Sequence, residues 1–248
     1  MSVLGAGEAF MLGAADDAAY VISKSLRFNS GDGARLSRTF ESAGARTTWT
    51  WSSWVKRTSL GTHVLFQGGN SDFNDDSIRF DGNDRLSLTV HNGTNAVAAQ
   101  LISTRVFRDF SAWMHIHVVY DSSENTVGDR IRFYVNGSRI EDFDTESYPG
   151  TNVVSHDIND GVIHYIGSFR GSQHYLNAYL AETQFVDGLA LEPTAFGGYA
   201  ATTGVWDPIK PEFTNLNDGT TWSSTLTATG AHSSGNPASF GFNGIPSY

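Results

Sequence analysis

Residues 113–140 constrain the fold more than any other part of this sequence. Apolar side chains alternate with other residues along Met114–Tyr120 and again along Ile131–Val135, which runs into the dipeptide Asn136-Gly137. A period of two places successive side chains on opposite faces of a β-strand, and Asn-Gly is a preferred pair for tight hairpin turns. The stretch therefore predicts antiparallel strands with one face on a core and the other in water. The predicted core seam includes Ile116, Val118, Ile131 and Phe133.

Strand signals of the same kind recur along most of the chain and predict eleven short strands. Turn residues such as Asp81-Gly82, Asn92-Gly93 and Asp187-Gly188 separate them. Many short strands at this spacing are typical of an all-β sandwich or jelly roll. The predicted strands are 26–28, 34–39, 49–56, 63–66, 77–80, 86–91, 97–103, 114–120, 131–135, 162–167 and 179–186.

The chain divides into three parts by composition. Residues 1–20 are rich in Ala and Gly without a clear period, which predicts an N-terminal arm or tether. Residues 21–196 carry the strand signals and predict one jelly-roll domain. Residues 197–248 are dominated by Gly, Thr, Ser and Pro with isolated aromatic anchors, which predicts a loop-rich C-terminal extension packed on the sandwich or on a neighbouring subunit. A length of 248 residues suits one large all-β domain with such extensions.

Charge and composition argue against several classes of protein. The formal charge is −10 with no compensating basic block, so the electrostatic footprint of a nucleic-acid binder is missing. No run of 18 apolar residues occurs, and Met1–Tyr20 has no basic start, so we expect neither membrane insertion nor a secretory signal. The absence of cysteine excludes disulfides, thiol catalysis and Cys-ligated zinc, and leaves stability to packing.

Several ordered motifs resemble laminin-G-like (concanavalin A-like lectin) jelly rolls. The motifs are Ser25–Phe28, Trp49–Arg57, Trp113–Ile116, Arg132–Gly137 and His164–Ser168. Two further runs, Tyr179–Pro193 and Gly204–Pro208, resemble a narrower group, the fibre, receptor-binding or capsid-decorating proteins of tailed-bacteriophage virions. The resemblance implies a lectin-like module on the virion surface that its N-terminal arm tethers to other virion proteins. It also implies a homo-oligomer, with a homotrimer favoured.

These features lead to three functional hypotheses. The first is a bacteriophage virion surface protein, in a fibre or a head or tail decoration, that binds cell-surface glycans during host adsorption through a loop edge or a concave sheet face. Repetition would raise a shallow site's avidity by roughly 10²–10⁴. The second is a structural decoration or anchoring protein without a sugar ligand. The third is a secreted carbohydrate-binding module.

We expect no enzymatic activity, although the lectin-like fold also houses glycoside hydrolases. A retaining glycosidase needs two carboxyls about 5–5.5 Å apart, which the related hydrolases place on one strand as Glu-x-Asp-x-x-Glu. In the nearest match, Glu141–Glu146, Phe143 stands where the middle carboxylate should be. Glu182 and Asp187 are five residues apart, so on a regular strand they point to opposite faces.

His115 and His117 share one face of a predicted strand, as two metal-binding imidazoles would. If Met114, Ile116 and Val118 face the core, both histidines lie on the outer face. Arg130, Arg132 and Tyr134 share that face, and the guanidinium groups would repel a divalent cation. We therefore predict a solvated or subunit-facing surface here.

The loop 70–76 offers oxygen ligands at alternate positions, Asp72, Asn74 and Asp76. Calcium takes six to eight oxygen ligands on flexible loops, and the resemblance implies a fold that commonly seats calcium at its loop edge. Ser77 and Asn83 stand where an EF-hand loop needs Gly and Glu, so a site would recruit ligands from elsewhere. The alternative is an acidic loop that forms Asx turns.

Aromatic side chains are the other candidate ligand contacts, because sugar rings stack on them. Trp49 and Trp51 share a face of one predicted strand and Trp113 opens another, which favours core positions for all three. Tyr148 and Tyr175 lie in predicted loops and Trp222 in the extension, so these three are candidate sugar contacts. Simple anchoring of loops is the alternative for each.

Overall fold

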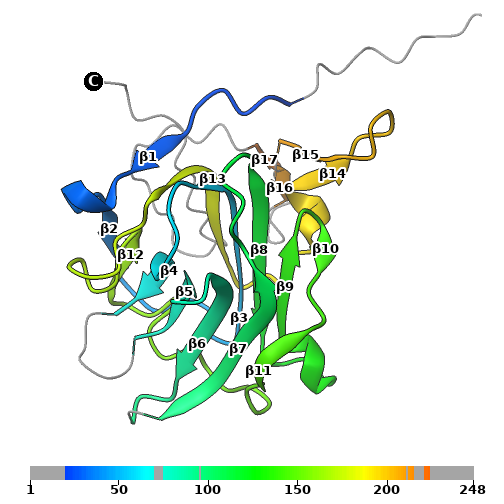
Figure 1. Ribbon diagram of the computed structural model, residues 1–248. Helices are drawn as coiled ribbons and strands as arrows, with labels where there is room; N and C mark the ends of the chain where they lie inside the picture. The colour runs from blue at the N-terminus through cyan, green and yellow to red at the C-terminus, as the bar shows by residue number, and fades with distance from the viewer. Residues whose placement is uncertain (1–19, 70–74, 95, 211, 215–220, 224–248) are drawn as a thin grey trace, which may run out of the picture.

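The computed structural model describes residues 20–69, 75–94, 96–210, 212–214 and 221–223, and these fold mainly into two stacked antiparallel sheets. Figure 1 shows the layers, with β5, β6 and β7 in front of β3. The six-stranded sheet runs in the order β1 (Leu26–Phe28), β13 (Ala178–Asp187), β3 (Thr48–Arg57), β8 (Met114–Asp121), β9 (Ile131–Val135) and β10 (Ser138–Arg139). The seven-stranded sheet runs in the order β11 (Phe143–Ser147), β7 (Val97–Val106), β6 (Arg85–His91), β5 (Ser77–Phe80), β4 (His63–Gly68), β12 (Ile163–Ile166) and β2 (Leu36–Thr39).

All eleven predicted strands are present, and the jelly-roll prediction is confirmed. The hairpin between β9 and β10 turns at Asn136 and Gly137, whose φ angles are 50° and 75°. Both values lie in the left-handed region that this tight turn requires and that Asn and Gly tolerate.

The core lies between the two sheets, as the alternation predicts. Ile116, Val118, Ile131 and Phe133 are at most 1% exposed and belong to one hydrophobic cluster. Trp49 and Trp51 are fully buried in the same cluster, which confirms their predicted core positions. Trp113 does not follow them: it is 36% exposed, so its predicted core position is wrong.

The sequence patterns missed several short strands. β11 carries charges at alternate positions and lies at the edge of its sheet, where inward and outward residues are less distinct. β10 has two residues. Four more short strands lie beyond residue 196: β14 (Gly197–Tyr199) pairs with β15 (Trp206–Pro208), and β16 (Glu212–Thr214) pairs with β17 (Thr221–Ser223). Three short 3-10 helices complete the described part of the chain: Ser30–Asp32, Val127–Asp129 and Pro193–Ala195.

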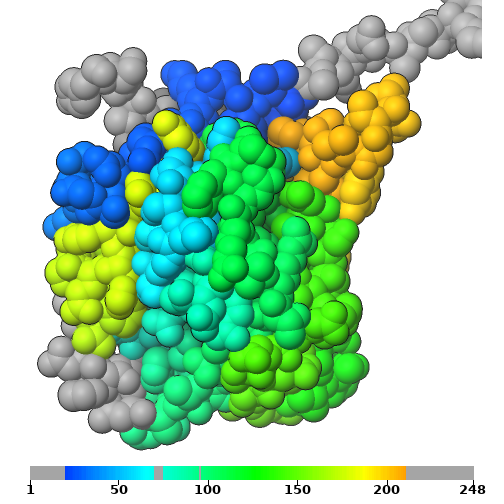
Figure 2. Space-filling model, viewed as in Figure 1, coloured from blue at the N-terminus to red at the C-terminus, as the bar shows by residue number. Residues whose placement is uncertain are grey.

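A segment of the chain itself covers the outer face of β8. Residues 189–208 cross this face, and Figure 2 shows residues 197–209, in yellow and orange, standing against the green of β9 and β10. Our prediction of a solvated or subunit-facing surface at His115 and His117 is therefore wrong, because both histidines are fully buried. No helix within the described ranges is long and apolar enough to cross a membrane.

Candidate functional site

The buried histidine pair is held by internal contacts. His115 Nδ1 accepts a hydrogen bond from the Trp206 indole N–H (3.1 Å), and its Nε2 lies 2.7 Å from the Ser52 hydroxyl. His117 Nε2 lies 2.9 Å from the Leu191 carbonyl oxygen, to which it donates. Burial lowers the pKa of both histidines to about 3, so both are neutral at pH 7. These imidazoles stabilise residues 189–208, which we call the covering segment, and are not exposed to a ligand.

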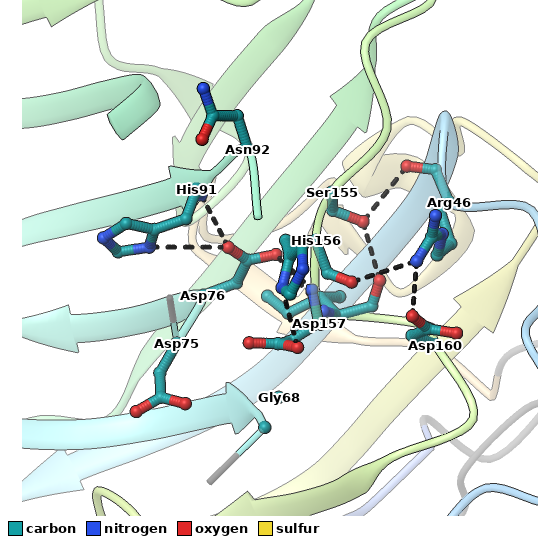
Figure 3. A network of polar contacts seen from close by, with 12 residues as sticks. Arg46, Gly68, Asp75, Asp76, His91, Asn92, Ser155, His156, Asp157 and Asp160 are labelled. Atoms are coloured by element: carbon teal, nitrogen blue, oxygen red, sulfur yellow. Dashed lines mark hydrogen bonds and ion pairs between the residues drawn. The ribbon is translucent and has the colours of Figure 1, made fainter. Parts of the chain in front are cut away.

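A network of polar groups lies at the loop edge where β5, β6 and the loop 150–162 meet (Figure 3). Its centre is Asp76, a fully buried carboxylate. One oxygen accepts the backbone N–H of His91 (2.7 Å) and the other accepts the backbone N–H groups of Asp157 (2.9 Å) and Ile158 (3.3 Å). Asp76 therefore ties the loop 150–162 to the seven-stranded sheet.

Asp157 is a second buried carboxylate beside Asp76. Its Oδ1 lies 2.9 Å from the His156 ring, whereas its Oδ2 is buried and makes no hydrogen bond with the described residues. The pKa of Asp157 is raised to about 6, mainly by burial and secondly by the negative charge of Asp76. Asp75 lies on the same edge and forms an ion pair with Arg170. Negative charge is thus concentrated at this edge of the sandwich.

The calcium prediction concerns this same edge. Asp72 and Asn74 lie outside the described residues, and no group of three metal-binding side chains occurs within the described ones. Both oxygens of Asp76 already accept backbone hydrogen bonds, whereas the unpaired Oδ2 of Asp157 suits a divalent cation better. Calcium binding at Asp72, Asn74 and Asp76 therefore stays a prediction, with Asp157 as a further candidate ligand.

Calcium is expected to stabilise the protein if this edge binds it. For a dissociation constant of roughly 0.1–1 mM, 10 mM calcium should add about 1.4–2.7 kcal/mol to the free energy of unfolding. That corresponds to a rise in Tm of roughly 3–10 °C. Thermal melts in EGTA, calcium and magnesium measure the effect, with Asp72→Asn as the comparison variant. A Tm that calcium and EGTA leave unchanged would rule the site out.

The three predicted aromatic contacts do not form one site in the described part of the chain. The Tyr148 hydroxyl donates to Glu146 (3.0 Å), and burial raises the pKa of Tyr148 to about 12. The Tyr175 hydroxyl donates to the carbonyl of Gly171 (2.9 Å), within its own loop. Trp222 lies in β17 opposite Phe213, and its side chain is outside the described residues. Sugar contact by these residues stays a prediction, and both tyrosines anchor local structure.

A different aromatic pair lies on the outer face of the six-stranded sheet. The rings of Trp113 and Tyr179 meet edge to face, with 6.4 Å between centroids. Tyr179 lies between Arg27 on β1 and Lys56 on β3, and the Arg27 guanidinium is 5.2 Å from the Tyr179 ring. These side chains point outward because their strand neighbours Phe28, Val55 and Leu180 are buried in the core. We call Arg27, Lys56, Trp113 and Tyr179 the aromatic platform.

Sequence patterns could not identify the aromatic platform. Trp113 stands one residue before β8, and a tryptophan that opens a strand is typically a core residue. Only the structure shows that 36% of Trp113 is exposed. Arg27, Lys56 and Tyr179 come from three strands that are far apart in sequence, so their cross-strand register had to be observed.

The comparison with protein families supports the lectin-like fold seen in the structure. Residues 28–194 match the family model of the concanavalin A-like lectin/glucanases superfamily, which covers more than half of the chain. The chain belongs to this superfamily. No curated protein matches it.

Solved structures resemble this lectin-like domain at low identity. Domains LG4-5 of the mouse laminin α1 chain are 12% identical at a TM-score of 0.46, with 66% of this chain and 41% of that chain covered. The heptameric SAP-like pentraxin from Limulus polyphemus is 15% identical at a TM-score of 0.41, with coverages of 67% and 73%. The NanB sialidase from Streptococcus pneumoniae is 17% identical at a TM-score of 0.47, with coverages of 71% and 28%. The lectin-like domain thus spans well under two thirds of the laminin and sialidase chains.

Glu182 and Asp187, which the sequence does not favour as a catalytic pair, have structural contacts in the lectin-like domain. Glu182 accepts a hydrogen bond from the Tyr20 hydroxyl (2.7 Å). Asp187 accepts from the backbone N–H of Ala45 (2.7 Å) and from the Asn159 amide. Superfamily domains of this type are typically binding modules, and these contacts give no positive sign of catalysis.

Proposed function

We propose that this protein is a glycan-binding module on the surface of a tailed-bacteriophage virion, and that it holds saccharides during host adsorption without cleaving them. The observation that carries the proposal is the aromatic platform on the six-stranded sheet. An exposed aromatic pair offers apolar ring faces to a sugar, and the flanking cations donate hydrogen bonds to its oxygens. Membership of a lectin superfamily supports the same interpretation.

The composition of the platform fits a shallow polar ligand better than a buried apolar one. Trp113 is 36% exposed, Arg27 is exposed, and Lys56 and Tyr179 are half-buried. Such a surface is too small and too polar to be a large exposed hydrophobic patch. It suits a weak site whose avidity comes from repetition in a homotrimer and on a particle.

The virion context of the proposal is supported by sequence resemblance. The run Tyr179–Pro193 contributes β13 and the start of the covering segment, and Gly204–Pro208 contributes Trp206 to it. Both runs resemble virion proteins. In this proposal the arm, residues 1–20, tethers the module to other virion proteins.

Replacing Trp113 with Ala is expected to weaken glycan binding. Loss of an aromatic contact worth about 0.5–1.5 kcal/mol corresponds to a roughly 2–13-fold increase in Kd. The experiment is a glycan array on the full chain, followed by calorimetry of Trp113→Ala with the best ligand. Tm should change little, because Trp113 is partly exposed and lies one residue before the start of β8.

Phe110→Ala is the matched control, because Phe110 is 39% exposed but outside the platform. The proposal fails if Trp113→Ala and Phe110→Ala bind the ligand as tightly as the parent chain. Silence of the whole array, together with stable trimers, would favour the structural decoration role instead.

A further inference from the structure

The middle strand of the seven-stranded sheet presents an arginine on its outer face. Arg79 lies on β5, with three strands on either side. Its strand neighbours Ile78 and Phe80 are fully buried in the core, so the Arg79 side chain points away from the sandwich. The residues directly opposite Arg79 are Val64 on β4 and Ser87 on β6.

Arg79 and Ser87 are side by side and both have unsatisfied polar atoms. The Arg79 Nε and the Ser87 Oγ are buried, and neither has a hydrogen-bond partner among the described residues. Ser87 as a whole is 1% exposed. Buried polar groups almost always have partners, so two adjacent exceptions on one face point to an oxygen-bearing ligand.

The local carboxylates do not neutralise Arg79. Asp81 attracts its charge, but Asp81 already forms an ion pair with Arg85 (2.7 Å) and accepts two backbone N–H groups. Asp75, on the neighbouring loop edge, is paired with Arg170. Burial lowers the pKa of His174, and the nearby charge of Arg79 lowers it further. His174 is therefore neutral at pH 7. Asp81 thus compensates the positive charge of Arg79 only in part.

The groups around Arg79 are hydroxyls and amides. Ser77, two residues before Arg79 on the same face, is opposite Thr89 on β6, and Thr89 is opposite Gln100 on β7. The Gln100 amide donates to the Thr89 hydroxyl (3.1 Å). These uncharged groups exchange hydrogen bonds with sugar hydroxyls as readily as with one another.

We propose that Arg79 and Ser87 form a second site, on the seven-stranded sheet, for a saccharide that carries a carboxylate. The guanidinium fork matches a planar carboxylate with two parallel hydrogen bonds, which a neutral sugar cannot supply. The partly exposed Gln100 contacts a sugar hydroxyl, and the buried Thr89 supports the Gln100 amide from below. This second site and the aromatic platform lie on different sheets. The proposal of the second site depends on the proposed function only because it takes a glycan as its ligand.

The test compares acidic oligosaccharides with their uncharged counterparts. Galacturonate, glucuronate and alginate oligomers are titrated into the full chain by calorimetry, in parallel with the same oligomers after reduction of their carboxyls to alcohols. We expect binding of at least one acidic oligomer and at least tenfold weaker binding of its reduced form. Arg79→Gln should weaken acidic binding at least tenfold, and Arg79→Lys should weaken it severalfold because it keeps the charge but loses the fork.

Two controls keep the result specific. Arg35→Gln removes the same charge from an exposed position and should leave binding unchanged. Ser87→Ala removes the unpaired hydroxyl, should fold normally, and should weaken binding severalfold. The site is refuted if no acidic oligomer binds, if reduced and acidic forms bind equally, or if Arg35→Gln acts like Arg79→Gln. Binding of neutral glycans that depends on Trp113 would leave the proposed function intact in each of those cases.

Discussion

Lowering the pH from 7 to 4.5 is expected to reduce the free energy of unfolding by about 5 kcal/mol through His115 and His117 alone. Each has a folded-state pKa of about 3 against an ordinary value of 6.5. A base whose pKa is lowered by folding binds its proton more readily in the unfolded chain. Stability is therefore intact above pH 6.5 and is lost as the pH falls toward 3. Each pH unit in this window costs about 1.4 kcal/mol per histidine.

The geometry explains why neither histidine accepts a proton in place. A proton on His115 Nδ1 would face the Trp206 indole N–H, so two donors would oppose each other. His117 has the Arg132 guanidinium nearby, which lowers its pKa further. The carboxylate of Glu192 lies 3.7 Å from Arg132 and is largely exposed, so it compensates that charge weakly. Protonation should therefore loosen the covering segment, residues 189–208, first.

Urea denaturation at pH 7 and pH 4.5 measures this effect. His63 and His164, whose pKa values burial lowers to about 4, add losses of the same sign. Asp157 acts in the opposite direction, because its raised pKa favours the folded state as the pH falls from 6 to 4. The decisive quantity is therefore the difference between variants: His117→Gln should reduce the pH dependence by about 2–3 kcal/mol. An unchanged pH dependence in His115→Gln and His117→Gln would contradict the assignment.

These histidines also mark the limit of what the sequence predicts. Alternation placed Ile116 and Phe133 in the core and His115 and His117 on the opposite face, and the structure confirms both statements. Alternation says nothing about what covers an outer face. The cover comes from a segment about 75 residues later in the sequence, without a strand period of its own.

The candidate site was predicted less well than the fold for a related reason. The aromatic platform and the Arg79–Ser87 pair are each assembled from strands distant in sequence. A one-residue change of register would turn such side chains to the other face. The bulge in β13, between Ala181 and Gln184, is a change of this kind and has no sequence signal that we recognised.

Replacing Trp206 with Ala is expected to reduce the free energy of unfolding by about 3–5 kcal/mol, the usual cost of removing a large buried aromatic side chain. Trp206 is 6% exposed, packs against the rings of His115 and Tyr199, and donates its N–H to His115. Gly137 and Gly197 have no room for a Cβ because the indole fills the space above them. The expected fall in Tm is roughly 6–20 °C.

The same variant tests where the folded domain ends. The family match stops at residue 194, and the sequence predicts a loop-rich extension from residue 197 that packs on the sandwich or on a neighbouring subunit. If residues 197–208 were a loosely attached extension, Trp206→Ala would cost less than about 1 kcal/mol. Trp206→Phe retains most of the ring packing and loses only the bond to His115, so it should cost about 1–2 kcal/mol. Val205→Ala, at a neighbouring position that is 57% exposed, should have almost no effect. That graded order is expected only if the covering segment is an integral layer of the sandwich, on which the burial of His115 and His117 depends.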